Sequence, residues 1–119
     1  MTTEPCLDAA TLEKLLQIGG EEFAVQMIDL FLSFIPQKLA EARSAWQDGD
    51  MLRLQKAVHP IKSSTSSIGA HKMQNLAEQI EQYALNNRSA QVTPLMSELE
   101  TAFGQVKAHL QERRKNLAV

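Results

Sequence analysis

Residues 48–70 read DGDMLRLQKAVHPIKSSTSSIGA, and this stretch decides how the rest of the chain is interpreted. It opens with a turn, and Asp50 is a natural N-cap because its carboxylate can accept a hydrogen bond from the first helical turn. Gly69 closes the segment, since glycine accepts the left-handed conformation of a helix C-cap. Between them, apolar residues recur every three or four positions, which predicts a helix over residues 51–67. Its apolar face consists of Met51, Leu54, Val58, Ile61, Thr65 and Ile68.

Two helices are predicted before this segment. Asp8 can cap a short first helix, and Gly19 and Gly20 end it without steric cost. A second, long helix is expected over about residues 21–47 because its apolar positions recur at helical spacing. Pro36 lies inside it and should bend it, since proline has no N–H to donate to the preceding turn. The apolar positions are Phe23, Met27, Leu30, Phe31, Phe34, Leu39, Ala42 and Trp46.

Two further helices are predicted after this segment. The first extends over about residues 70–85. The last extends from about Ala90 or Pro94 to Lys115. If it starts at Pro94, Thr93 serves as the N-cap and proline occupies the first helical position, where its missing N–H costs nothing. The connections between all these helices are short, so neighbouring helices should be antiparallel.

The composition is that of one helical domain. The chain has 119 residues, 44% of them hydrophobic and 22% charged, which are ordinary globular values. This length buries a core without a metal or a disulfide. The expected fold is therefore all-α, an antiparallel four-helix bundle with a short additional N-terminal helix. It should form a single domain over residues 1–119 with its core at about 8–115.

Charge and hydropathy exclude several classes of protein. The formal charge of −2 gives no general attraction to nucleic acid. No apolar run approaches the ~20 residues of a membrane span. Cys6 is the single cysteine, so an internal disulfide is excluded and a reducing cytoplasm suits the chain. The first residues lack the regions of a signal peptide. We expect a cytoplasmic protein. The start at Met1 and the polar C-terminal end favour a free-standing protein, and a fragment of a hybrid kinase stays the alternative.

His59 is the residue on the central helix that points to chemistry. It falls more than about 100° from the centre of the apolar face, on the solvent side. Gln55, Lys62, Ser63 and Ser66 should surround it, because they lie three, four or seven positions away. Small neighbours leave the imidazole open to a partner. Lys62 supplies positive charge near any phosphoryl group placed on the ring.

The same helix breaks two local rules beside His59. Five hydroxyl residues in a row, at 63–67, are poor helix formers because they offer the backbone competing hydrogen bonds. Pro60 cannot donate to the Lys56 carbonyl and crowds it, which costs ~3 kcal/mol in an ordinary helix. A kink beside His59 is expected. Violations of this kind inside a helix are typical of working sites.

Residues 59–70, HPIKSSTSSIGA, resemble the signature of histidine-phosphotransfer (HPt) domains, His-x-Leu-Lys-Gly-Ser-Ser/Ala-x-x-Leu/Ile/Val-Gly-Ala. Residues 76–81, LAEQIE, resemble the family's following helix. The resemblance extends over about residues 8–110. It implies that His59 accepts a phosphoryl group, that Lys62 helps to hold the phosphoryl oxygens, and that Glu81 orients the imidazole.

The sequence departs from the family pattern at two positions. Ser63 stands where glycine is common, which narrows access to the ring, although its hydroxyl could donate to a phosphoryl oxygen. Glu81 stands where the family has Gln or Glu. As an ionised acid it can accept the ring N–H, but it would repel a phosphate placed close to it.

The resemblance further implies a phosphoryl carrier in a two-component phosphorelay. The partner would be a receiver domain of a hybrid sensor kinase or of a response regulator, and this partner would supply Mg²⁺. The chain has no glycine-rich phosphate loop, so no kinase activity and no cofactor of its own are expected. The alternative is an HPt-like binding module that docks on a kinase or receiver and inhibits it without carrying phosphate. A monomer is expected, and either ring nitrogen could carry the phosphate.

Other residues are weaker candidates for partner contact or for accepting a phosphoryl group. Leu52 lies two turns before His59 on the same side, and it is the predicted apolar contact for a partner, together with Gln55 and Ser66. His71 lacks small neighbours. His109 is expected on the flank of its helix or half-buried, and the three histidines have no local metal spacing.

Overall fold

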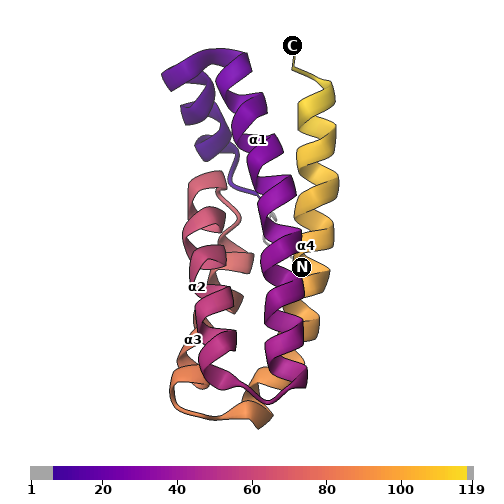
Figure 1. Ribbon diagram of the computed structural model, residues 1–119. Coiled ribbons are helices and arrows are strands. Elements are labelled where there is room, and N and C mark those ends of the chain that lie inside the picture. Colours follow the sequence, from indigo (N-terminus) through magenta and orange to yellow (C-terminus); the bar gives the residue numbers. More distant parts are fainter. Residues whose placement is uncertain (1–6, 118–119) are drawn as a thin grey trace, which may run out of the picture.

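The computed structural model describes residues 7–117, and every element in this range is a helix (Figure 1). The four helices are α1 (Ala9–Gln47), α2 (Met51–Ile68), α3 (His71–Leu85) and α4 (Ser89–Lys115). α2 packs against α1 and α3, and α4 packs against α3 and α1. The predicted antiparallel four-helix bundle is confirmed.

The predicted break between the first two helices lies inside α1. Gly20 has φ 80° and ψ −172°, a conformation that glycine adopts without a steric penalty. Figure 1 shows the segment before Gly20 doubling back beside the turns that follow it. The short N-terminal helix is therefore present, capped by Asp8, whose side chain accepts from the Ala10 N–H at 2.9 Å.

The caps predicted for α2 are both present. The Asp50 carboxylate accepts from the Arg53 N–H at 3.1 Å, and Gly69 takes the left-handed conformation with φ 81° and ψ 22°. The helix continues through Pro60. Two of its hydroxyl residues bond to carbonyls of the preceding turn: Thr65 Oγ1 donates to the Ile61 oxygen at 2.8 Å, and Ser67 Oγ donates to the Ser63 oxygen at 3.2 Å. This back-bonding satisfies hydroxyl groups that would otherwise compete with the helix.

Gly69, at the end of α2, is also bonded to the N-terminal arm, which comprises residues 8–11. The Asp8 N–H donates to the Gly69 carbonyl at 2.8 Å. A Cβ at position 69 would lie 2.8 Å from Thr11 Cβ and 3.0 Å from Asp8 Cβ. The arm therefore packs against a position that has no room for a side chain.

We predict that Gly69→Ala destabilises the protein by about 2–4 kcal/mol, since it combines the left-handed penalty with overpacking. Gly49→Ala is the matched control, because Gly49 has φ 69° and no atom within 4 Å of the added Cβ. It should cost only about 1–2 kcal/mol. Urea unfolding of the two variants measures the difference, and equal losses would show that the arm does not constrain Gly69.

Of the two predicted starts of the last helix, Ala90 is close to the observed one, whereas a start at Pro94 with Thr93 as the N-cap is wrong. α4 begins at Ser89, so Pro94 lies inside the helix. Thr93 instead accepts a hydrogen bond from the Trp46 indole N–H at 3.4 Å. The earlier start places Val92 in a fully buried position, and this burial offsets the backbone hydrogen bond that Pro94 cannot make.

The apolar face predicted for the long helix is only partly right. Ile28 and Ile35 are fully buried, whereas Leu30 is 64% exposed. The segment carries apolar residues on more than one face, so spacing alone did not separate the core positions from the others. The residues of this helix that line the core are Ala24, Val25, Ile28, Phe31, Ile35, Ala42 and Ala45.

Candidate functional site

Glu81 is the single buried acid among residues 7–117. It lies on α3 directly after Ile80, which is fully buried, and its own exposed fraction is 4%. A buried carboxylate is costly unless hydrogen bonds and a cation compensate it. The groups that bind the Glu81 carboxylate therefore show how its burial is compensated.

Three side chains of α2 converge on the Glu81 carboxylate. His59 Nδ1 lies 2.6 Å from Oε2. Gln55 donates its Nε2–H to the same oxygen at 2.9 Å. Lys62 donates from Nζ to Oε1 at 2.8 Å. The donors lie at i−4, i and i+3 around His59, so one side of α2 presents all of them to α3.

The Glu81 carboxylate is ionised at neutral pH. Burial alone would raise the pKa of this group. Hydrogen bonds from Lys62, Gln55 and His59, together with the Lys62 charge, outweigh burial and lower the pKa from 4.5 to about 2. The same contact raises the pKa of the Lys62 ammonium, mainly through its hydrogen bond to Glu81. The two groups form an ion pair in the resting protein at physiological pH.

The geometry fixes the tautomer of His59. An ionised carboxylate only accepts, so Nδ1 must carry the proton that it donates to Glu81. Nε2 then holds the lone pair. The side chain is 57% exposed although Nδ1 is bound to a buried group, so the edge of the ring with Nε2 is the accessible one. An exposed, oriented imidazole nitrogen is a nucleophile.

The other predicted site residues lie around this cluster. Ser63 and Ser66 are exposed, and Leu52 is 62% exposed. Gln55 is half-buried, and its amide donates to Glu81. The sequence predicted Gln55 as a partner contact, and the structure adds its hydrogen bond to Glu81.

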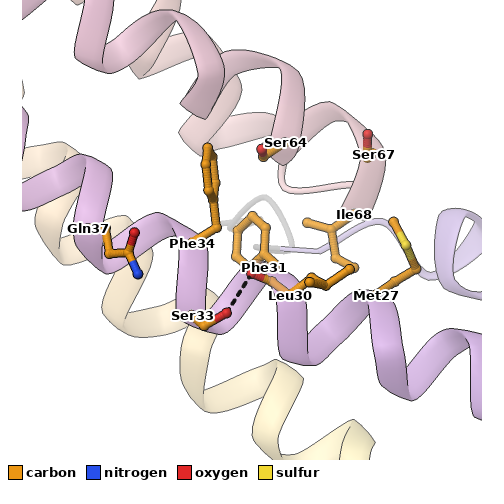
Figure 2. Close-up of a pocket in the computed structure, with 9 residues that line it drawn as sticks. All are labelled: Met27, Leu30, Phe31, Ser33, Phe34, Gln37, Ser64, Ser67 and Ile68. Carbon is orange, nitrogen blue, oxygen red and sulfur yellow. Dashed lines mark hydrogen bonds between the residues drawn. The ribbon is translucent and has the colours of Figure 1, made fainter.

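An apolar groove lies between α1 and α2 (Figure 2). Its volume is about 370 Å³. Ser64, Ser67 and Ile68 form its α2 wall, five, eight and nine residues after His59. Leu30 on the α1 side is largely exposed. The sequence did not identify this groove, although the surplus of apolar positions in the long helix is the signal for it. The apolar lining comes from Met27, Leu30, Phe31, Phe34 and Ile68.

The remaining histidines lie away from Glu81. His71 Nε2 lies 3.2 Å from Asp8 Oδ2, so this residue braces the N-terminal arm. Its hydrogen bond is the main cause that lowers the pKa of the Asp8 carboxyl. His109 is exposed on α4 rather than half-buried. Among residues 7–117, no group of three His, Cys, Asp or Glu side chains could hold a metal ion.

Fold and site together define a class: a helical bundle that presents one oriented imidazole above a buried acid. The sequence matches the Hpt domain family over residues 26–115, and the chain belongs to this family. The resemblance of residues 59–70 is thereby confirmed. No helix within residues 7–117 is long and apolar enough to cross a membrane.

The chain is also similar to individual proteins. It is 26% identical over 98 residues to the phosphorelay intermediate protein rdeA of Dictyostelium discoideum. That match covers 82% of this chain and 39% of the relative, so the chain spans about two fifths of the relative's length.

Two solved structures share the fold. The first is histidine-containing phosphotransfer protein B (HptB) of Pseudomonas aeruginosa PAO1, with a TM-score of 0.90 and 23% identity, covering 96% of this chain and 98% of that one. The second is the HPT domain of a sensor hybrid histidine kinase from Shewanella, with a TM-score of 0.82 and 16% identity. It covers 96% of this chain and 97% of that one.

Proposed function

We propose that this chain is a histidine-containing phosphotransfer protein. It accepts a phosphoryl group on His59 from the aspartyl phosphate of a receiver domain and passes it to another receiver. The observation that carries this proposal is the 2.6 Å contact between His59 Nδ1 and Glu81 Oε2, which leaves Nε2 as the exposed nucleophile. Membership of the Hpt domain family supports the same reaction.

In the transfer step, one bond to phosphorus forms while another breaks. The Nε2 lone pair attacks phosphorus while the bond from phosphorus to the aspartyl oxygen breaks, and the aspartate leaves as a carboxylate. The Nδ1 proton stays on the ring, which becomes cationic. The reverse step, to a second aspartate, regenerates the neutral imidazole. Positioning and charge neutralisation are the main requirements of such a displacement.

The neighbours of His59 take distinct roles in this step. The Lys62 ammonium provides a charge-assisted hydrogen bond to the phosphoryl oxygens, and the exposed Ser63 hydroxyl can donate to the same group. Glu81 binds the Nδ1 edge of the ring, so the imidazole separates its charge from a phosphoryl group on Nε2. This placement removes the repulsion expected from the sequence.

The proposed partner is a receiver domain, either of a hybrid sensor kinase or of a response regulator. The Mg²⁺ that neutralises the phosphoryl group is assigned to this partner. The chain itself acts as a carrier without a kinase site, as a cytoplasmic monomer. The α2 wall of the groove lies more than one turn beyond His59, and the groove is apolar, so we assign it to an apolar element of the receiver.

Leu30→Asp should weaken receiver docking. It places a charge in the groove at a largely exposed position, so the fold is retained while the half-saturating receiver concentration rises about tenfold. Thr101→Asp adds the same charge at an exposed site of α4 and should leave transfer unchanged. Leu52→Asp tests the residue predicted from the sequence. Unaltered transfer by Leu30→Asp would place the receiver elsewhere.

The direct test of the function is label transfer. A receiver domain carrying a radioactive aspartyl phosphate is mixed with the chain, and label should appear on the chain in an acid-labile, alkali-stable form, as expected of a phosphoramidate. Retained binding without label would favour the inhibitory module instead.

A further inference from the structure

The Lys62 ammonium is bound to the Glu81 carboxylate, although phosphoryl transfer requires it at another place. Lys62 Nζ lies 2.8 Å from Glu81 Oε1 in the structure, whereas the transfer step needs this ammonium at the phosphoryl group. A buried carboxylate cannot release its countercharge without a replacement. The replacement must therefore arise during the reaction itself.

The reaction creates such a replacement at the right atom. The form of His59 that attacks phosphorus has a free lone pair on Nε2, so its ring is neutral and the charges of Glu81 and Lys62 cancel. When Nε2 forms its bond to phosphorus, the ring keeps the Nδ1 proton and becomes positive. This N–H already points at Glu81 Oε2 from 2.6 Å. The new cation consequently forms in contact with the buried carboxylate.

We infer that Glu81 changes its charge partner during phosphoryl transfer. In the resting protein its countercharge is Lys62, and in the phosphorylated protein it is the cationic ring of His59, so that Lys62 is released to the phosphoryl oxygens. The inference rests on the proposed carrier function. Glu81 is thus a positioning residue that acts through His59 and Lys62, and return of the phosphoryl group restores the resting pair.

The geometry permits this exchange without disturbing the core. Lys62 and His59 bind different oxygens of the carboxylate, so Lys62 can leave while the contact of His59 persists. Gln55 stays on Oε2 and keeps the carboxylate in place. The Lys62 side chain is 28% exposed and lies one turn from His59, so its ammonium can reach the solvent edge of the ring.

The other charged groups near α2 do not replace Glu81 in this role. Glu78 of α3 is exposed and acts on Lys62 only through its field. On α1, Lys38 and Glu41 pair with each other at 3.1 Å. They line a shallow hollow with Arg53 and Lys56. Within residues 7–117, Glu81 is the anion that contacts the His59 ring.

Nitrogen NMR tests the exchange directly. Spectra of ¹⁵N-labelled protein are recorded before and after phosphorylation by a phosphorylated receiver. We expect phosphorus coupling to His59 Nε2, a retained proton on Nδ1, and a shifted Lys62 Nζ resonance. A ring without the Nδ1 proton, or an unmoved Lys62 resonance, would overturn the exchange and leave the carrier function intact. Absence of phosphate on the chain would overturn both.

A matched pair of variants provides a second test of the exchange of charge partners. Glu81→Gln keeps the shape of the side chain but removes the charge that holds the Nδ1 proton on the phosphorylated ring. Transfer from this variant to a receiver, relative to wild type, should fall about tenfold or more at about pH 8 and recover at about pH 6. Glu78→Gln should match wild type at both. A deficit of Glu81→Gln that is independent of pH, or no deficit, would contradict the inference.

Discussion

Replacing His59 with glutamine abolishes phosphoryl acceptance, with a fall of about 10³-fold or more in the rate of label transfer from a phosphorylated receiver. Glutamine has no nitrogen lone pair able to attack phosphorus, because its amide nitrogen is conjugated with the carbonyl. The exposed position on α2 and a side-chain amide that can still donate to Glu81 should preserve the fold. Binding to the receiver should therefore persist.

The other histidines provide the controls for this result. His71→Gln and His109→Gln should accept label at the wild-type rate, since neither residue contacts Glu81 or Lys62. Helical circular dichroism of all three variants should match that of wild type. Label that persists on His59→Gln would mean that a different residue accepts the phosphoryl group.

The second large effect concerns stability in acid. The pKa of the Glu81 carboxyl is about 2 in the folded chain against an ordinary value of 4.5, so the unfolded chain binds this proton first as the pH falls. The stabilisation is complete above about pH 5 and is lost progressively as the pH falls towards 2. Its size is about 3 kcal/mol.

Glu81→Gln isolates this contribution. Between about pH 5 and pH 2 the wild-type free energy of unfolding should decrease by about 3 kcal/mol more than that of the variant, because glutamine does not titrate. Denaturant unfolding at several pH values measures both curves. Parallel curves would show that the folded and unfolded chains bind a proton at position 81 equally well.

The fold could be predicted from the sequence because local signals were consistent with one another. Asp50 and Gly69 cap α2 where residue type and apolar spacing placed them. The sequence left the start of α4 open between Ala90 and Pro94. The helix begins at Ser89 because burial of Val92 favours the longer helix, although local rules place Pro94 at a helix start.

The candidate site was only partly predictable, because it depends on contacts between different helices. Spacing on one helix brings His59 and Lys62 together, and only the family resemblance pointed to Glu81, which lies 22 residues away in sequence. The hydrogen bond from Gln55 to Glu81 could not be predicted, because spacing on one helix does not reveal which residue of α3 lies opposite it. The groove beside Leu30 depends on how α1 and α2 pack, which a single helical pattern does not specify.

The central claim is that His59 carries a phosphoryl group between two proteins, and a pulse–chase transfer tests it most directly. The chain is labelled by one phosphorylated receiver, separated from it, and then mixed with a second, unlabelled receiver. We predict that label leaves the chain and appears on the aspartate of the second receiver. Label that never reaches the chain, or that leaves it only as inorganic phosphate, would contradict the account.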